Sequence, residues 1–450
     1  MSAELLDLAT RIAGRAEKGE DLEAFVTHER SFYVKAFEGE PEAVSSSEPR
    51  GAGARLVTDH RVGYAYTTDL SEEGLATLVA DARDNARFAT QDDAAGLPDA
   101  SESAPGEVAG LIDPTQSGAT AEQKVAFAVE LERATRASDP RVRTEEAIYS
   151  DSEAEVAIAS SLGVEGAYSE TNAWCYSVAI ATEGDDTQVA FDFDLARGLG
   201  GLDAGGVGER AARRALGVLG ARKIPSTRMP VIFDPYTSGQ FLGVLASALT
   251  GEAVHKGRSL FARRIGETVA ATNLTLVDDG RIAGAPGSSP WDGEGVATRR
   301  TDVIHAGVLR SFLYDTISAR RAGATSTGNA SRSGFKTAPG IAPTNLAFDT
   351  TGESAEDLLA MAGRALYVQD FHGVHSGANA VTGDFSVGAT GRLVEDGSLA
   401  RPVREVTIAA PMLEILAGVR AVATDRRWLP FGGSYGGATT LVAEMTVAGE

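Results

Sequence analysis

Apolar residues recur every three to four positions in four stretches of the first half of the chain. These stretches are the opening segment through Ala16, residues 71–88, a segment that begins at Thr120, and residues 209–219. This spacing places the apolar side chains on one face of a helix, so we predict four amphipathic helices. Gln123 stands three residues after Thr120, which is the spacing of a capping box at a helix N-terminus.

Short apolar runs between these helices predict β-strands. The runs lie at residues 24–26, 32–34, 156–159 and 176–180. Helices and strands therefore alternate in the first half of the chain, which is typical of an α+β domain and compatible with an internal duplication. The stretch 90–120 is rich in Ala, Asp, Gly, Pro and Ser, and we expect it to be an exposed connection.

The second half of the chain carries hairpin signals in place of repeated helical periods. The candidate turns, each between apolar runs, are Asp279-Gly280, residues 305–307 and Asp396-Gly397. Only two helices are expected here, one over about 235–261 and one that begins at Ser354. We therefore predict an α+β fold, with a mixed α/β N-terminal domain over 1–225 and a mainly antiparallel β C-terminal domain over 226–450.

The excess of acidic over basic residues limits the classes of partner that this protein can bind. The chain has 450 residues, with 63 Asp and Glu against 41 Lys and Arg, and a formal net charge of -22. This excludes a nucleic-acid binder that works by bulk positive charge, and it disfavours docking on anionic membranes. No apolar stretch reaches the ~18 residues of a membrane span, and the N-terminal segment mixes charged with apolar residues. The single cysteine, Cys175, cannot form an internal disulfide, so we expect a cytoplasmic protein.

Three motifs are candidates for a catalytic or ligand-binding role. Residues 205–208 are rich in glycine but match neither a dinucleotide fingerprint nor a Walker loop, so we interpret them as a turn before a helix. Ser434 has glycines at both two-residue offsets, as in a hydrolase elbow. However, a strand-like segment follows it and no histidine comes after it. Cys175 lies in an apolar run and is interpreted as a buried, inert thiol.

The histidines leave a metal site open as an alternative. Glu252 and His255 share one face of a helix, and His372 and His375 form a second close pair. These four residues could hold a metal ion if the fold brought the two pairs together. Alternatively, Glu252 pairs with Lys256 one turn later, and the two histidines of the second pair form ordinary hydrogen bonds.

Several long blocks of this sequence resemble the TldD/PmbA family over nearly the whole chain. These blocks are residues 219–225, 249–259, 292–301, 307–309, 313–315, 318–320, 327–330 and 381–389. The strongest is 292–301, Asp-Gly-Glu-Gly-Val-Ala-Thr-Arg-Arg-Thr. Many ordered blocks make the resemblance more specific than a single motif would.

The resemblance implies a particular metal motif, from which this chain departs. TldD-type subunits carry His-Glu-x-x-x-His, and the two histidines and a later cysteine hold a metal that activates water. Here Gly251 and Lys256 stand at the two histidine positions and Glu252 at the glutamate, while Ser434 and Tyr435 occupy the region of the cysteine. Glycine offers no ligand, and a lysine ammonium has no lone pair. The resemblance therefore implies the TldE/PmbA branch, which lacks the metal motif.

The leading hypothesis is a metal-free subunit of a heterodimeric metallopeptidase that acts on unfolded or extended peptides. The resemblance implies a TldD-type partner that carries zinc or a similar metal, with no cofactor in this chain. The candidate site residues are then Glu252, His255 and Lys256, on a helix that faces the shared chamber. One alternative is an autonomous hydrolase in peptide or natural-product maturation. Another is a non-catalytic homodimer that binds peptides; neither nucleic acid nor membrane is expected as a partner.

Overall fold

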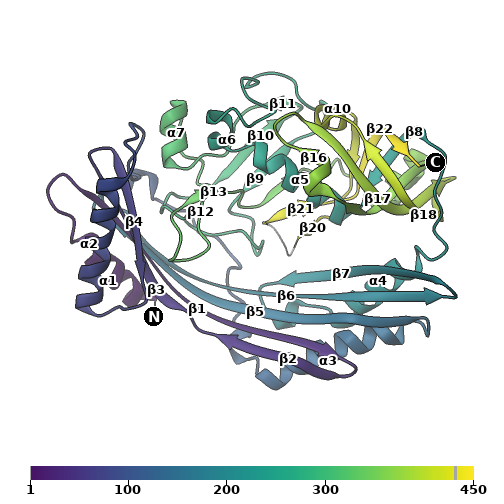
Figure 1. Ribbon diagram of the computed structural model, residues 1–450, viewed down its shortest axis with the longest axis horizontal. Helices are drawn as coiled ribbons and strands as arrows, with labels where there is room; N and C mark the ends of the chain where they lie inside the picture. Colours follow the sequence, from purple (N-terminus) through teal and green to yellow (C-terminus); the bar gives the residue numbers. More distant parts are fainter. Residues whose placement is uncertain (1, 430–432, 450) are drawn as a thin grey trace.

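The computed structural model describes residues 2–429 and 433–449, which form two large layers (Figure 1). One layer is a long curved sheet built by the first half of the chain, drawn in purple to teal. The other is the β-rich second half, drawn in green to yellow, which lies across one face of that sheet. This arrangement confirms the predicted α+β fold with a β-rich second half.

The first half contributes four helices and seven strands among the described residues. The helices are α1 (Ser2–Ala13), α2 (Glu72–Phe88), α3 (Ala121–Ala137) and α4 (Ala204–Leu216). The strands are β1 (Asp21–Phe37), β2 (Glu40–Ser47), β3 (Arg50–Thr58), β4 (Arg61–Thr67), β5 (Val142–Ser160), β6 (Glu165–Glu183) and β7 (Asp186–Ala196). The sheet has the order β4-β3-β1-β5-β6-β7, and β2 pairs with the second part of β1. Every pairing in it is antiparallel.

The direction of the side chains alternates along β1, and this shows why the two faces of the sheet contact different parts of the protein. Ala24 and Val26 are buried in the cluster that contains α1 and α2. Glu23 and Phe25, on the opposite face, contact the second half of the chain through Arg332. Successive side chains of a strand point to opposite faces, so one strand can pack on helices and carry interdomain contacts at once.

The second half of the described chain contains six helices and fifteen strands, many of them short. The helices are α5 (Pro235–Ala248), α6 (Gly251–His255), α7 (Thr316–Ala322), α8 (Ala355–Ala362), α9 (Val374–Gly377) and α10 (Met412–Ala417). The first strands are β8 (Thr227–Phe233), β9 (Leu276–Asp279), β10 (Arg300–His305), β11 (Val308–Leu309), β12 (Ala330–Ser331), β13 (Gly340–Ile341) and β14 (Leu346–Phe348). The remaining strands are β15 (Ala365–His372), β16 (Ala378–Asn379), β17 (Asp384–Glu395), β18 (Ser398–Ala409), β19 (Val419–Val422), β20 (Arg427–Trp428), β21 (Tyr435–Gly437) and β22 (Thr440–Ala448).

Two larger sheets organise this half. One runs β15-β8-β22-β18-β17-β16, and β15 also pairs with β17, so the five longer strands close on themselves as a small barrel. The other has the order β11-β10-β9-β14-β21-β20. Only β15–β8 and β14–β21 are parallel pairs among the described strands. The main core lies between these sheets and α5, with Phe233, Phe241 and Phe385 at its centre.

Most predicted helices form near the expected residues. Ser71 caps α2, and Thr120 and Gln123 form the predicted capping box of α3. Ser354 caps α8 in the same way. The fourth helix starts earlier than predicted, because Asp203 caps it and the glycines 205–208 lie inside its first turns, not before it. A Cβ at Gly208 would lie 2.7 Å from the backbone nitrogen of Thr135, so this glycine lets α4 approach α3 closely.

The predicted single helix over 235–261 is wrong. α5 ends at Ala248, and Thr250 adopts an extended conformation and accepts a hydrogen bond from the amide of Ala253. The short helix α6 then begins at Gly251, because an extended capping residue breaks the helical backbone and starts a new one. The expectation of only two helices also fails, because α6, α7, α9 and α10 are too short to show several helical periods.

The segment 90–120 is not simply an exposed connection. Leu97, Leu111 and Gln116 are buried. Arg320 donates a hydrogen bond to the carbonyl of Leu97, and Trp291 donates one to the carbonyl of Ser103. The segment therefore lies against the second half of the chain. Its polar composition reflects backbone hydrogen bonding across the domain contact, which composition alone does not distinguish from exposure.

Two of the three predicted hairpins are confirmed. Residues 305–307 join β10 to β11, and Asp396-Gly397, both with positive φ, join β17 to β18. Asp279-Gly280 is not a hairpin turn, because the strand that pairs with β9 on this side begins only at Arg300. No helix among the described residues is both long and apolar enough to cross a bilayer.

Candidate functional site

The three candidate site residues lie together on or beside α6. Lys256 Nζ donates a 2.6 Å hydrogen bond to Glu252 Oε1, and both side chains are about half exposed, at 49% and 48%. This is the ion pair that the one-turn spacing predicted. His255 is exposed on the same short helix and lines an open cavity together with Asp92, Arg320 and Arg321. The surroundings of α6 therefore carry both acidic and basic groups, and two of these, Arg321 and Asp92, form an ion pair.

Gly251, where the resemblance implies the first histidine of the TldD-type motif, has no room for a side chain. It is buried, and a Cβ atom there would lie 2.5 Å from Cε1 of Tyr314 and 3.1 Å from Cβ of Ser318. The Tyr314 ring thus occupies the space into which a histidine at 251 would project. Together with the Lys256 ammonium at the second histidine position, this means that the residues here do not fit a metal ion.

The other two early candidates are bound within the fold. Ser434 Oγ donates a 2.7 Å hydrogen bond to Asn345 Oδ1, so its proton faces an amide and not a base. Gly432, the first glycine of its motif, lies outside the described residues. Cys175 is fully buried, and burial raises the pKa of its thiol. The interpretation of Cys175 as an inert thiol is supported by both facts.

The two histidine pairs do not form one site. His372 ends β15 and His375 lies on α9, and the only polar contacts of His372 in the described chain are with Thr390 and Asp370. Within residues 2–429 and 433–449, no three His, Cys, Asp or Glu side chains converge as metal ligands do. The structure therefore does not bring Glu252, His255, His372 and His375 together.

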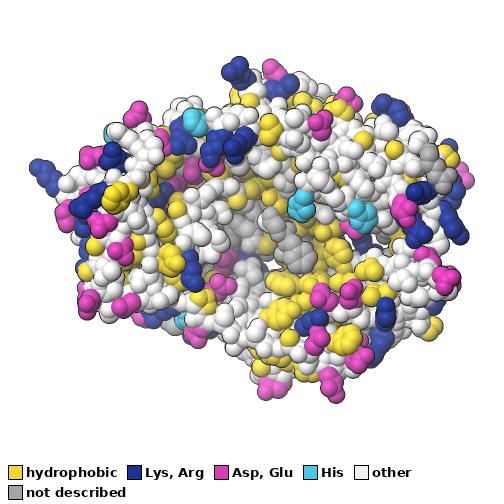
Figure 2. Space-filling model, viewed as in Figure 1, with side chains coloured by type: hydrophobic (Ala, Val, Ile, Leu, Met, Phe, Trp, Pro, Cys, Tyr) yellow, Lys and Arg dark blue, Asp and Glu magenta, His cyan; other side chains and the backbone are white. Residues whose placement is uncertain are grey.

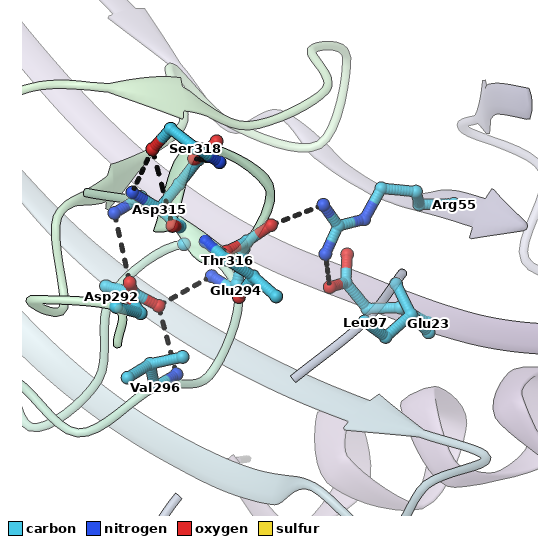
Figure 3. A network of polar contacts seen from close by, with 12 residues as sticks. Glu23, Arg55, Leu97, Asp292, Glu294, Val296, Asp315, Thr316 and Ser318 are labelled. Carbon is cyan, nitrogen blue, oxygen red and sulfur yellow. Dashed lines mark hydrogen bonds and ion pairs between the residues drawn. The ribbon is translucent and has the colours of Figure 1, made fainter. Parts of the chain in front are cut away.

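The strongest sequence block forms a buried network at the contact between the two layers (Figure 3). Glu294, from the loop that precedes β10, forms an ion pair with Arg55 of β3, and Arg55 also binds Glu23 of β1. Arg332 binds the other oxygen of Glu23. All four charged side chains are at most 2% exposed. Alternating acidic and basic groups thus connect the large sheet to the second half of the chain.

Asp292 adds a buried acidic group of a different kind. Its carboxyl group accepts hydrogen bonds from the backbone amides of Glu294, Val296 and Ala330, and no cation of the described residues forms an ion pair with it. Burial, together with the nearby charge of Glu294, raises the pKa of Asp292 to about 8. Burial acts on Glu294 in the same direction, but Arg55 outweighs it and lowers the pKa of Glu294.

A cavity of about 460 Å³ lies next to this network, between the layers. Tyr168, Glu170 and Asn172 of β6 form one wall, and Trp291 and Arg332 belong to the opposite side. Arg197 joins the two sides, because it contacts Glu170 and Asn172 and also donates to the carbonyls of Ala285 and Ser288, in the facing loop. This site has the size and the mixed polar and aromatic lining of a ligand cavity.

Sequence reasoning missed this network, although it identified block 292–301 as the strongest. The block begins with two acidic residues that are separated by glycine and followed by another glycine and two apolar residues, which was the available signal. Arg55, the ion-pair partner of Glu294, lies 239 residues away in the chain, so no local pattern could pair them.

Comparisons with known proteins agree with this architecture. Models described as PmbA/TldA metallopeptidase domain 1, central domain and C-terminal domain match residues 22–86, 115–219 and 226–449. The chain is 28% identical to the metalloprotease PmbA of Escherichia coli O157:H7 over 446 residues, which are 98% of this chain and 95% of that protein. It is 27% identical to a TldD homologue of Haemophilus influenzae over 398 residues, 85% of this chain and 81% of that protein.

Solved structures show the same fold. TldE from Thermococcus kodakarensis superposes with a TM-score of 0.85 at 24% identity, over 100% of both chains. A Thermotoga maritima protein described as a candidate modulator of a DNA gyrase gives a TM-score of 0.88 at 24% identity, over 98% of this chain and 99% of that one. Since matching domain models cover most of the sequence in the same order, the chain belongs to the TldD/PmbA family of metallopeptidases.

Proposed function

We propose that this chain is the metal-free subunit of a heterodimeric TldD/TldE-type peptidase, and that a TldD-type partner supplies the metal. The observation that carries the proposal is the Tyr314 ring in the space that a histidine at 251 would need. The pairing of Lys256 with Glu252 supports it, because a cation already neutralises the carboxylate that would serve as the base.

The substrate class in this proposal is an unfolded or extended peptide. Family membership supports a peptidase role, since the similar curated proteins are named metalloproteases. Extended peptides bind through their backbone to sheet edges and to clefts between layers. In the complex, Glu252, His255 and Lys256 would face the shared chamber as charged wall residues, and the partner would perform the hydrolysis.

Co-purification with a TldD-type subunit tests the proposal. We expect the chain alone, prepared without a metal-binding tag, to contain substoichiometric metal and to leave an unfolded casein substrate intact. The pair should form a stable complex, cleave casein, lose activity with a chelator and regain it with zinc. Absence of a complex, or stoichiometric metal in the chain alone, would refute the proposal.

Matched variants separate a chamber role from a structural one. Glu252→Gln with Lys256→Met removes both charges of the exposed pair and should preserve hydrolysis by the complex to within a few-fold. The corresponding change of the motif glutamate in the partner should abolish it. If the variant in this chain were the one that abolished hydrolysis while the complex stayed intact, the active centre would lie in this chain.

A further inference from the structure

A second cavity, of about 540 Å³, lies between β7 and the barrel. Val189, Ala190 and Phe191 of β7 form an apolar wall, and residues of β15, β17 and β18 face them. Figure 2 shows hydrophobic side chains gathered in the hollow between the two layers. This cavity is separate from α6, and its lining residues all belong to the described chain.

Three functional side chains of the barrel meet at this cavity. His372 Nε2 lies 2.9 Å from Thr390 Oγ1, and His372 Nδ1 lies 3.7 Å from Asp370 Oδ2. Asp370 and His372 are two residues apart on β15, so they point to the same face, and Thr390 pairs directly with Asp370 from β17. A hydroxyl, an imidazole and a carboxylate therefore stand in a row, with each imidazole nitrogen facing one partner.

The backbone around Thr390 is irregular on both sides. The pairing of β15 with β17 shifts register between Val368 and Asp370, and the pairing of β17 with β18 shifts between Ala389 and Gly391. Glu405, on the β18 side of the second shift, has a φ of 52°, which is uncommon for a non-glycine residue. Bulges change the direction of side chains and are frequent beside functional sites. Two bulges at Thr390 therefore indicate a functional role for this part of the barrel.

We propose that Thr390, His372 and Asp370 form an acyl-transfer site for uncharged esters with apolar acyl chains. Thr390 is the nucleophile, His372 the general base, and Asp370 a positioning residue that lies beside the imidazole at ion-pair distance. The same order of hydroxyl, imidazole and carboxylate activates a nucleophile in enzymes of several unrelated folds. A hydroxyl needs such a base because it is a weak nucleophile at neutral pH. The apolar wall of β7 accommodates the acyl chain.

The chemical steps need no reactant other than the ester and water. Thr390 Oγ1 attacks the ester carbonyl, and its proton moves to His372 Nε2. The bond from the carbonyl carbon to the alkoxy oxygen breaks, and the departing alcohol takes the proton from His372. Water, deprotonated by the same nitrogen, then cleaves the acyl-threonine and releases the carboxylic acid. Arg404 lines the same cavity, where its guanidinium is paired with Asp186 and Glu405.

Several charged groups lie around His372. Asp370 stands beside it on β15, Arg404 and Glu405 face it from β18, and Arg214 of α4 lines the same cavity. The β7 residues of the cavity carry no charge. Burial raises the pKa of Asp370, and the charge of His372 opposes this rise, as expected for two groups in close electrostatic contact.

The test uses the purified full chain alone, with p-nitrophenyl butyrate as substrate and an alkyl fluorophosphonate as the covalent probe. We expect chelator-insensitive hydrolysis and one phosphonate adduct per chain, located at Thr390 by peptide mass spectrometry. Thr390→Ser should keep both, and Thr390→Val should abolish both. His372→Gln should lower kcat/KM about 100-fold or more, since general bases contribute about that much.

His375→Gln is the matched control, because this exposed histidine lies on α9 outside the cavity lining. It should leave rate, pH profile and adduct unchanged. Circular dichroism verifies that each variant is folded. Absence of hydrolysis and of adduct in the folded wild-type chain, or an adduct at any residue other than Thr390, overturns the inference. Neither result bears on the metal-free subunit, which is tested by metal content and by the complex.

Discussion

The buried network between the two layers makes the sharpest prediction about stability. Replacement of Arg55 by methionine removes a guanidinium that is 2% exposed and leaves Glu294, which is fully buried, without a cation. Glu23 keeps Arg332 as its partner. Removing one member of a buried ion pair typically costs about 3–5 kcal/mol, because the remaining charge stays desolvated and uncompensated. We therefore expect Arg55→Met to lower the free energy of unfolding by about that amount.

Urea denaturation measures this loss, with circular dichroism following the whole chain. Intrinsic fluorescence follows the three tryptophans, among them Trp291, whose indole donates to the carbonyl of Ser103 across the layer contact. Coincident transitions would show that both layers unfold together, so that one free energy describes the change. The double variant Arg55→Met with Glu294→Gln removes the stranded charge as well. Its cost should be smaller than the cost of Arg55→Met alone.

Arg30→Met provides the matched control, because Arg30 forms a similar ion pair with Glu48 at the surface, where both side chains are more than half exposed. Exposed pairs contribute roughly 0–1 kcal/mol, since water already solvates both charges. If Arg55→Met cost no more than Arg30→Met, the burial argument for the network would be refuted.

Three further predictions concern single groups. Asp292 keeps its proton to about pH 8 in the folded chain but loses it near pH 4 when unfolded, so stability should fall as pH rises between these values. Asp292→Asn should flatten this part of the stability profile; an unchanged slope would contradict the assignment. Gly251→Ala should destabilise the chain by about 1–3 kcal/mol in urea, through overlap with Tyr314, and Tyr314→Ala in the same chain should relieve part of that loss. Cys175 should not react with Ellman's reagent in the native chain and should give one thiol after unfolding, whereas fast native labelling would disprove its burial.

Local patterns predicted the parts of this protein that depend on local interactions. Helical periods and capping residues found α2, α3 and α8, because helix hydrogen bonds and caps join residues three or four apart. The same reasoning joined α5 and α6 into one helix, because nothing in the apolar period shows that Thr250 turns extended. Composition misjudged 90–120, where polar backbone groups contact the other layer.

The sequence by itself determined the family, and it fixes Gly251 and Lys256 around Glu252, since both are properties of residue identity along the chain. It also determined the one-turn pair of Glu252 and Lys256, because helix geometry is nearly invariant. Only the tertiary structure decided that Tyr314 fills the space beside Gly251 and that Arg55 reaches Glu294. It alone placed Thr390 opposite Asp370. Such contacts depend on strand register, on bulges and on the docking of two layers, which many distant packing interactions set together and no short segment encodes.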